Sequence, residues 1–329
     1  MAEIVESGVL IRDVETKNIM TKSTLPVGGY SVNPYVGCTH GCKYCYASFM
    51  KRFTGHTEPW GTFLDVKHWP AIKNPRKYAG QRVVIGSVTD GYLPQEEQFG
   101  NTRRLLEQLK GSGAEILICT KSDLVVRDID LLKEMGKVTV SWSINTLDEG
   151  FKNDMDNAVS IQRRLDAMKQ VYDAGIRTVC FTAPVFPGIT DFEAIFHRVK
   201  DQCDLVWLEN LNLRGGFKKT SWPIFRRNTL TSCRCTTPSI PEETGAISGS
   251  WRSGQSALRE NMIVPLWTTN SPTAGQSRGI RSSWITFITR KCAARRTPAS
   301  GIGEPPWRKV NPLTPKGGSF VSQLGSFAK

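Results

Sequence analysis

Residues 37–46 read Gly-Cys-Thr-His-Gly-Cys-Lys-Tyr-Cys-Tyr and place three cysteines, Cys38, Cys42 and Cys45, in one short loop at C-x3-C-x2-C spacing. A structural zinc site takes four protein ligands, and an iron–sulfur cluster held only by protein takes four cysteines. Three thiolates in one loop therefore indicate a cluster with one iron left open. An open iron can bind a substrate or a cofactor.

Two other interpretations of this loop stay open, namely a zinc knuckle completed by His40 and free thiols that happen to lie close together. The aromatic residue Tyr44, directly before Cys45, and the strand-like segment upstream favour the cluster. Gly37 and Gly41 allow the backbone to turn sharply and to approach the cluster closely. We therefore expect a cluster loop in which His40 is a spacer.

Strand-like and helix-like segments alternate on both sides of the loop. Apolar runs predict strands at 30–36, 82–88, 115–119, 138–144, 177–182 and 205–211, and helical periodicity predicts helices at 43–52, 94–109, 123–135, 158–174 and 192–200. Such alternation requires parallel strands with crossover helices, and a site at the carboxyl ends of the strands follows. Composition does not separate a partial barrel from an open doubly wound sheet. Residues 53–78 are expected to be irregular.

The cysteine loop resembles the C-x3-C-x-aromatic-C motif of the radical S-adenosylmethionine (SAM) enzymes. The flanking Asn33-Pro34-Tyr35-Val36 and Tyr46-Ala47 are similar to the branch of spore photoproduct lyase-like proteins, often labelled DNA repair photolyases. More narrowly, they resemble radical SAM proteins encoded as neighbouring pairs on mobile elements. The resemblance covers residues 28–219, follows an N-terminal lead at 1–27, and implies an α/β fold with a partial (β/α)6 TIM-type barrel.

The resemblance also implies cofactors and partners. Cys38, Cys42 and Cys45 would hold a 4Fe–4S cluster whose fourth iron chelates SAM, and a donor such as flavodoxin or ferredoxin would reduce it. Cleavage of SAM would yield a 5′-deoxyadenosyl radical that abstracts hydrogen from a nucleic-acid-related substrate, in a lyase or transferase reaction. A paired radical SAM protein is the expected partner. Spore photoproduct lyases carry a hydrogen-donating cysteine near the end of the second strand, where this chain has residues 86–88, Gly-Ser-Val, which argues against thymine-dimer repair.

Polar residues follow the strands where the resemblance would place SAM. Lys121 would hold the methionine carboxylate as a point charge, and Arg163 or Arg164 would reach the cofactor from a helix. The full predicted set of cofactor-binding residues is Tyr44, Thr89, Asp90, Lys121, Ser122, Ser143, Asn145 and Pro184. The alternative for each strand end is an ordinary turn or helix cap, and for the arginines a solvated helix face.

Two further classes of function compete with the enzyme: a zinc-dependent nucleic-acid-binding module and a catalytically silent partner of a paired protein. The module would use an aromatic and basic rim for nucleic acid, formed by Trp60, Trp69, Lys73, Arg76 and Lys77, unless both tryptophans simply pack. Visible absorption of an anaerobically purified cluster separates zinc from iron. Cleavage of SAM separates an enzyme from a silent partner.

Composition limits the cellular setting. The chain has 329 residues, 39% of them hydrophobic, and nine cysteines, which fit a reducing compartment. Residues 1–6 carry acid where a secretory leader carries base, and no apolar run of membrane length appears, so we expect a cytoplasmic protein without a leader or a membrane partner. Of the formal net charge of +13, residues 220–329 hold +11, from 15 Lys+Arg against 4 Asp+Glu.

Residues 220–329 are expected to be an out-of-frame, irregular and disordered extension. They contain no Asp, Tyr or His, and they show no amphipathic period. In the frame that begins on the third nucleotide of each codon, Trp284 followed by Ile285 must give GAT, an Asp codon. Residues 283–295 can then read V-D-Y-F-Y-H-E-E-V-R-G-T, which resembles the aromatic and acidic C-terminal segment expected of intact relatives. A natural basic tail that binds nucleic acid is the alternative.

Resequencing the gene across codons 215–225 tests this prediction, because the break is expected near Lys219-Thr220. The core would then lack the segment that closes its barrel, which leaves apolar surface exposed and the chain unstable or inactive. An alternative frame without enrichment of Tyr, Asp or His would refute the prediction.

Overall fold

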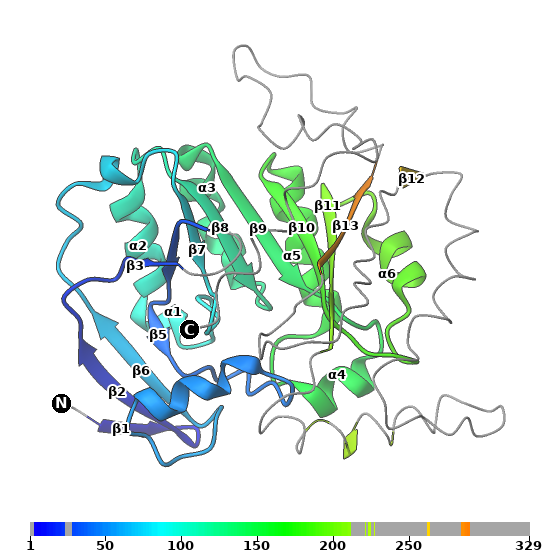
Figure 1. Ribbon diagram of the computed structural model, residues 1–329, viewed down its shortest axis with the longest axis horizontal. Helices are drawn as coiled ribbons and strands as arrows, with labels where there is room; N and C mark the ends of the chain where they lie inside the picture. The colour runs from blue at the N-terminus through cyan, green and yellow to red at the C-terminus, as the bar shows by residue number, and fades with distance from the viewer. Residues whose placement is uncertain are drawn as a thin grey trace, which may run out of the picture.

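The computed structural model describes residues 3–23, 28–211, 221, 223–224 and 227, together with strands at 262–263 and 284–289. Within this part of the chain, six parallel strands lie side by side in the order in which they occur in the sequence (Figure 1). They are β4 (Tyr30–Val32), β7 (Arg82–Ile85), β8 (Glu115–Thr120), β9 (Val138–Ser143), β10 (Arg177–Val185) and β11 (Leu205–Asn210). β4 and β11 are not neighbours. The six-stranded partial barrel is therefore confirmed.

Crossover segments connect these strands. They contain α1 (Glu96–Phe99), α2 (Asn101–Leu109), the 3₁₀ helix η3 (Leu124–Asp128), α3 (Ile129–Met135), α4 (Glu149–Met155), α5 (Ile161–Asp173) and α6 (Phe192–Val199). Helices α2, α3, α5 and α6 pack on one face of the sheet, whereas α4 packs in a separate cluster with Tyr44 and Phe186. Leu105 of α2 and Leu165 of α5 join Ile118 and Trp142 of the strands in one buried apolar cluster. Full burial of each such aliphatic side chain stabilises the fold by roughly 1.5–3 kcal/mol.

Strand alternation leaves the other face of the sheet available for a site. Ile118 and Trp142 point into the helix-packed cluster, so their neighbours Cys119 and Ser143 point to the opposite face. Both of these side chains are half-buried. The functional groups at the ends of the strands therefore face the cysteine loop rather than the helices.

A second sheet was not predicted from the sequence. Its order is β1 (Glu3–Glu6), β2 (Val9–Glu15), β6 (Phe63–His68) and β5 (Tyr35–Val36), and it lies beside the lower end of the main sheet (Figure 1). The expectation of irregular structure at 53–78 was wrong for β6, which pairs in parallel with β2 from Leu10↔Phe63 onward. Strand β5 leads directly into the cysteine loop, so this sheet supports the start of the loop.

Several predicted helices differ in detail. The segment after the cysteines is a 3₁₀ helix, η1 (Tyr46–Phe53), with no side-chain cap at its start and no acidic residue in its first turn. The helix expected at 94–109 breaks at Gly100, whose φ is +63°. Helix α4 was missed, and it begins where Asp148 accepts a hydrogen bond from the backbone N–H of Phe151 at 3.0 Å. The left-handed Gly100 therefore accounts for the divided helix, and the Asp148 cap accounts for the start of α4.

The edges of the main sheet carry short antiparallel strands. β3 (Thr21–Lys22) pairs with β4, β13 (Trp284–Thr289) pairs with β11, and β12 (Met262–Ile263) pairs with β13. Ile224 packs against an apolar cluster around Phe151. The remainder of 220–329, and with it most of the prediction of an irregular extension, lies outside the described residues.

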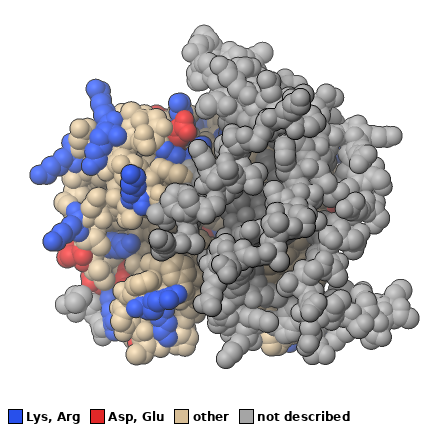
Figure 2. Space-filling view, in the orientation of Figure 1, with Lys and Arg blue, Asp and Glu red and all other residues tan. Residues whose placement is uncertain are grey.

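Both tryptophans of the predicted aromatic and basic rim pack against the protein, as the alternative interpretation predicts. The Trp69 ring is buried, and its Nε1–H donates to Gln108 Oε1 at 3.1 Å. The Trp60 ring is half-buried and packs near Cys38. Figure 2 shows Lys and Arg side chains dispersed over the described part of the face turned toward the viewer.

None of the described helices combines the length and the apolar character that spanning a bilayer requires.

Candidate functional site

The cysteine loop is shaped by glycines with positive φ, and a side chain at Gly37 or Gly61 would collide with the neighbouring backbone. Gly37 and Gly41 have φ values of +88° and +54°. A Cβ added at Gly37 would lie 2.3 Å from the carbonyl oxygen of Phe63, and one added at Gly61 would lie 2.9 Å from Cα of Gly41. The loop is therefore pressed against the chain that leads into β6, as the sequence predicted for the two loop glycines.

The three cysteines of the loop affect one another's ionisation. Burial, together with negative charge on Cys45 and Asp90, raises the pKa of Cys38 to about 12. Burial likewise raises the pKa of Cys42, and the charges of Cys45 and Cys38 add to the effect. Each of these thiols is free of disulfide bonding. This mutual influence supports the prediction of one donor set at the end of β5.

Three cysteines fit a cluster with one open iron, whereas a structural zinc ion takes four protein ligands. Among the described residues, no three His, Cys, Asp or Glu side chains converge closely enough to hold one metal ion. A cubane cluster instead binds each cysteine through a different iron, so its ligands lie further apart than those of one ion. His40 Nε2 lies 3.0 Å from Asp90 Oδ2, which supports its prediction as a spacer.

Asp90 connects the cysteine loop to the main sheet through hydrogen bonds to both. Its carboxylate accepts hydrogen bonds from His40 Nε2 at 3.0 Å, from the backbone N–H of Lys121 at 2.7 Å and from that of Tyr92 at 2.9 Å. The Thr120 hydroxyl donates to the same carboxylate at 2.9 Å. Burial raises the pKa of Asp90, but the hydrogen bond and charge of His40 and the two backbone donors outweigh burial, so the net pKa is lowered.

Three of the predicted cofactor residues make contacts within the protein instead of leaving their polar groups open. Both carboxylate oxygens of Asp90 are occupied, as described above. The Thr89 hydroxyl donates to the Gly37 carbonyl at 2.5 Å. The Ser122 hydroxyl accepts from the backbone N–H of Leu124 at 3.1 Å. These contacts favour the alternative of turns that support the loop.

Lys121 lies beside the cysteines. Its Nζ is 5.5 Å from the centroid of the Tyr44 ring. Its positive charge lowers the pKa of Cys42 and of Cys45, although burial dominates and leaves both values raised. Among the described residues, no carboxylate pairs with the Lys121 ammonium. The ammonium is therefore a local positive charge that an anionic ligand could meet.

Tyr44 is held in place by the ends of β9 and α4. Its hydroxyl donates to Asp156 Oδ2 at 3.2 Å and accepts from Asn145 Nδ2 at 3.2 Å. Asn145 Nδ2 also lies 3.4 Å from the Ala183 carbonyl, next to Pro184 on β10. Tyr44 and Asn145 thus meet beside the cysteine loop, next to the residue that precedes Pro184, and their role in binding SAM stays a prediction.

Sequence reasoning missed the support that the connection between α4 and α5 gives to the loop. The backbone N–H of Asn157 donates to the His40 carbonyl at 2.8 Å. Arg164 is fully buried, and its Nη2 donates to Asp156 Oδ1 at 2.8 Å. Arg164 Nη1 also donates to the Ser143 carbonyl at 3.2 Å, so Ser143 takes part through its backbone.

Neither arginine of the predicted pair is open to a ligand. Arg163 is bonded to Asp123 at 2.7 Å, on the surface, and Arg164 is committed to the buried contacts above. More than one hundred residues separate Arg164 from the cysteine loop, so no spacing in the sequence could have indicated that it supports the loop.

The helix-free face next to the cysteines is lined by half-buried side chains. They are Cys119, Ser143, Phe181, Trp207 and Glu209. Burial raises the pKa of Glu209, which favours its neutral acid form. Burial also raises the pKa of Tyr46, and charges on Cys45, Cys119 and Glu209 add to it. Tyr46, the last residue of the cysteine loop, therefore lies near Cys45, Cys119 and Glu209.

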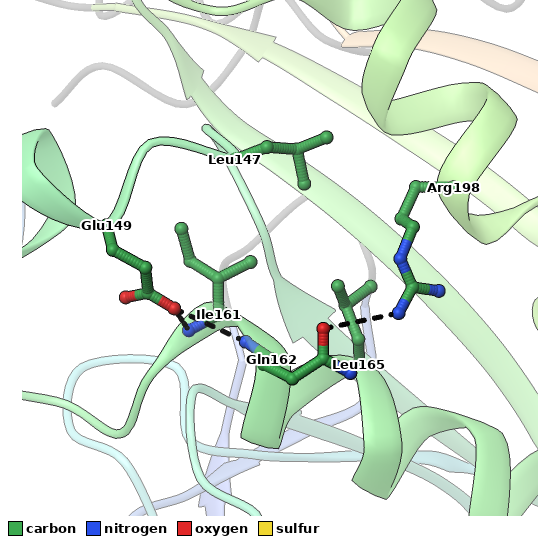
Figure 3. A pocket seen from close by; sticks show the side chains of 6 residues that line it. All are labelled: Leu147, Glu149, Ile161, Gln162, Leu165 and Arg198. Carbon is green, nitrogen blue, oxygen red and sulfur yellow. Dashed lines mark hydrogen bonds between the residues drawn. The ribbon is translucent and has the colours of Figure 1, made fainter.

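A pocket elsewhere in the molecule is unrelated to this site. Leu147, Glu149, Ile161, Gln162, Leu165 and Arg198 line it (Figure 3). Glu149 Oε1 accepts from the backbone N–H of Ile161 at 2.6 Å, and Arg198 Nη2 donates to Gln162 Oε1 at 3.4 Å. Its polar groups thus cap and brace α5 on the helix side of the sheet.

Comparisons with known proteins agree with this arrangement. A sequence profile of the Radical SAM superfamily matches residues 32–199, which is just over half of the chain. An uncharacterized protein of Methanocaldococcus jannaschii is 35% identical over 212 residues, which cover 64% of this chain and 80% of that protein. A radical SAM Nα-GlyT isomerase of Pseudomonas phage M6 is 28% identical over 177 residues, which cover 53% of this chain and 35% of that protein.

A solved structure shares the fold. It is a spore photoproduct lyase double mutant with bound AdoMet and dinucleoside spore photoproduct, and it superposes with a TM-score of 0.51 at 14% identity. The match covers 86% of this chain and 75% of the lyase chain. Because the profile matches more than half of the chain, the chain belongs to the radical SAM superfamily, whose members use a 4Fe–4S cluster and SAM.

Proposed function

We propose that this chain holds a 4Fe–4S cluster through Cys38, Cys42 and Cys45 and cleaves SAM reductively to abstract hydrogen from a nucleic-acid-related substrate. The observation that carries the proposal is one loop with three cysteines free of disulfide bonding, Cys38 buried and Cys42 and Cys45 half-buried, beside Tyr44 and the Lys121 ammonium. When bound, the cluster and SAM supply a one-electron reduction and a 5′-deoxyadenosyl radical, and the protein supplies position and electrostatics.

The chain's own residues contribute to binding in three ways. The thiols must lose their protons to hold iron, and the Lys121 charge favours that ionisation at Cys42 and Cys45. The same ammonium offers a counter-charge for the methionine carboxylate of SAM. Asp90 and His40 keep the loop fixed while these ligands bind.

The helix-free face is proposed as the substrate side. Its half-buried Cys119 and Glu209 lie near Tyr46, at the end of the cysteine loop. The dinucleoside bound in the solved lyase structure supports a nucleic-acid-related substrate. Residues 86–88, Gly-Ser-Val, replace the cysteine expected of a thymine-dimer lyase, so we propose a different reaction.

The site sets conditions on partners and compartment. A one-electron donor such as flavodoxin or ferredoxin is proposed to reduce the cluster, and a second radical SAM protein encoded beside this one is proposed as the functional partner. The thiols are free of disulfide bonding in the described structure, and thiols persist in reducing compartments. We propose a reducing compartment, the cytoplasm, as the location of the protein.

Replacing Lys121 with Ala is expected to weaken SAM binding about tenfold or more, because a hydrogen bond to a charged group contributes roughly 1.5–3 kcal/mol. Iron content should stay unchanged, since Lys121 is not a ligand. Titration of the reconstituted protein with SAM measures the effect, and Lys133→Ala, an exposed lysine on α3, is the matched control. Equal affinity for SAM in both variants would show that Lys121 does not contact the cofactor.

Anaerobic reconstitution followed by electron paramagnetic resonance (EPR) tests the proposed function. The reduced cluster is expected to show a signal that changes shape when SAM is added, because SAM binds the open iron. A protein that holds zinc, or holds a cluster whose signal is indifferent to SAM, would contradict the proposal.

A further inference from the structure

Trp60 lies directly against the cysteine loop. The residue that follows it, Gly61, has a φ of +103°, and a Cβ added there would lie 2.9 Å from Cα of Gly41 and 3.9 Å from the carbonyl oxygen of Cys38. The backbone at Gly61 therefore touches the loop that carries the cysteines. Because no side chain fits between them, Trp60 cannot move away without moving the loop.

The Trp60 ring has a defined orientation. It meets the Phe63 ring edge to face, with centroids 5.7 Å apart and an interplanar angle of 84°. The Phe63 ring is in turn stacked on His56 at 4.0 Å. Trp60 also packs against the apolar cluster that contains Cys38 and Leu64. Contacts on both sides thus fix the direction in which its N–H points.

The indole N–H is buried and lacks a hydrogen-bond partner among the described residues. Trp can only donate, and an unsatisfied buried donor is destabilising. The same N–H lies on the side of the Cys45 sulfur and lowers the pKa of that thiol, although burial keeps the value raised overall. A neutral thiol is a weak acceptor, whereas a thiolate bound to iron carries negative charge and accepts more strongly.

We propose that Trp60 is a positioning and tuning residue whose Nε1–H donates a hydrogen bond to the Cys45 sulfur once that sulfur binds the cluster. The inference rests on the proposed function. Hydrogen bonds to the cluster sulfurs help to set its reduction potential. The donor stabilises the added negative charge of the reduced cluster, so Trp60 makes the cluster easier to reduce. The backbone N–H groups of Ala47 and Ser48, which also approach Cys45, act in the same direction.

The Trp60→Phe variant of the reconstituted full chain tests this inference, because Phe keeps the ring and removes the N–H. The expected result is an unchanged iron content with a lower midpoint potential. At a fixed applied potential, the ratio of reduced to oxidised cluster should fall about tenfold, which corresponds to about 59 mV for a one-electron couple. An exchangeable proton coupled to the reduced cluster, seen by electron–nuclear double resonance and lost in D2O, should disappear in the variant.

Trp69→Phe is the matched control, since the Trp69 N–H donates to Gln108 and should leave the potential unchanged. If Trp60→Phe does not fold, 3-benzothienylalanine at position 60 keeps the shape of Trp without its N–H and serves the same measurement. A cluster of unchanged potential and unchanged proton coupling in either variant would overturn the inference. A wild-type chain that binds no cluster would instead overturn the proposed function.

Discussion

Replacing Cys42 with Ala is expected to abolish cluster binding, because the two remaining thiolates cannot hold a cubane firmly. Cys42 is half-buried, and the charges of Lys121, Asp156 and the other two cysteines all act on its thiol. Removing it therefore leaves an incomplete donor set in a site built for three ligands. Iron and sulfide analysis after anaerobic reconstitution measures the loss.

The control is Cys180→Ala. Cys180 is fully buried in the helix-packed cluster, away from the cysteine loop, so its removal should leave the iron content of the protein unchanged. A Cys42 variant that retains about four irons per chain, the full complement of a cubane, would show that the assignment of ligands is wrong.

Replacing Asp90 with Ala is expected to destabilise the protein and to disorder the cysteine loop. The change leaves His40 and the backbone N–H of Lys121 without their buried acceptor. Breaking a buried pair by removing one partner costs about 3–5 kcal/mol. Denaturant unfolding of the metal-free protein measures the loss of stability, and iron analysis measures the loss of the site.

Asp130→Ala is the comparison, because Asp130 pairs with Arg103 at 3.3 Å on the exposed surface of α3. Exposed pairs contribute little, so this variant should unfold close to the wild-type denaturant concentration. If the Asp90 variant also did so and kept its cluster, Asp90 would not be the anchor of the loop.

The main sheet could be predicted because its signals are local and continuous. The buried strands read as apolar runs, as in Val83, Val84 and Ile85 of β7, and helical periodicity lies between them. Strict alternation then allows little other than parallel strands with crossovers. The same reasoning could not find β6, which contains Asp65, Lys67 and His68 and pairs with a strand more than fifty residues away.

The candidate site was likewise predictable only where its residues lie close together in the sequence. The three cysteines and their glycines lie within ten residues, so their spacing alone predicted a common donor set. Asp90 and His40 meet across fifty residues, and the sequence shows Asp90 only as a polar residue after a strand. It was therefore predicted as a cofactor contact, whereas the structure gives its carboxylate to the protein. The interpretation of Trp60 as a packed residue agrees with its burial, but the direction of its N–H depends on tertiary contacts.

Formation of 5′-deoxyadenosine tests the central claim most directly. The full chain is reconstituted anaerobically with iron and sulfide, reduced and supplied with SAM, and the products are separated by chromatography. We expect 5′-deoxyadenosine and methionine from the wild-type protein and neither product above background from the Cys42→Ala variant. A wild-type chain that holds an intact cluster and binds SAM, yet forms no more 5′-deoxyadenosine than the Cys42 variant, would contradict the account.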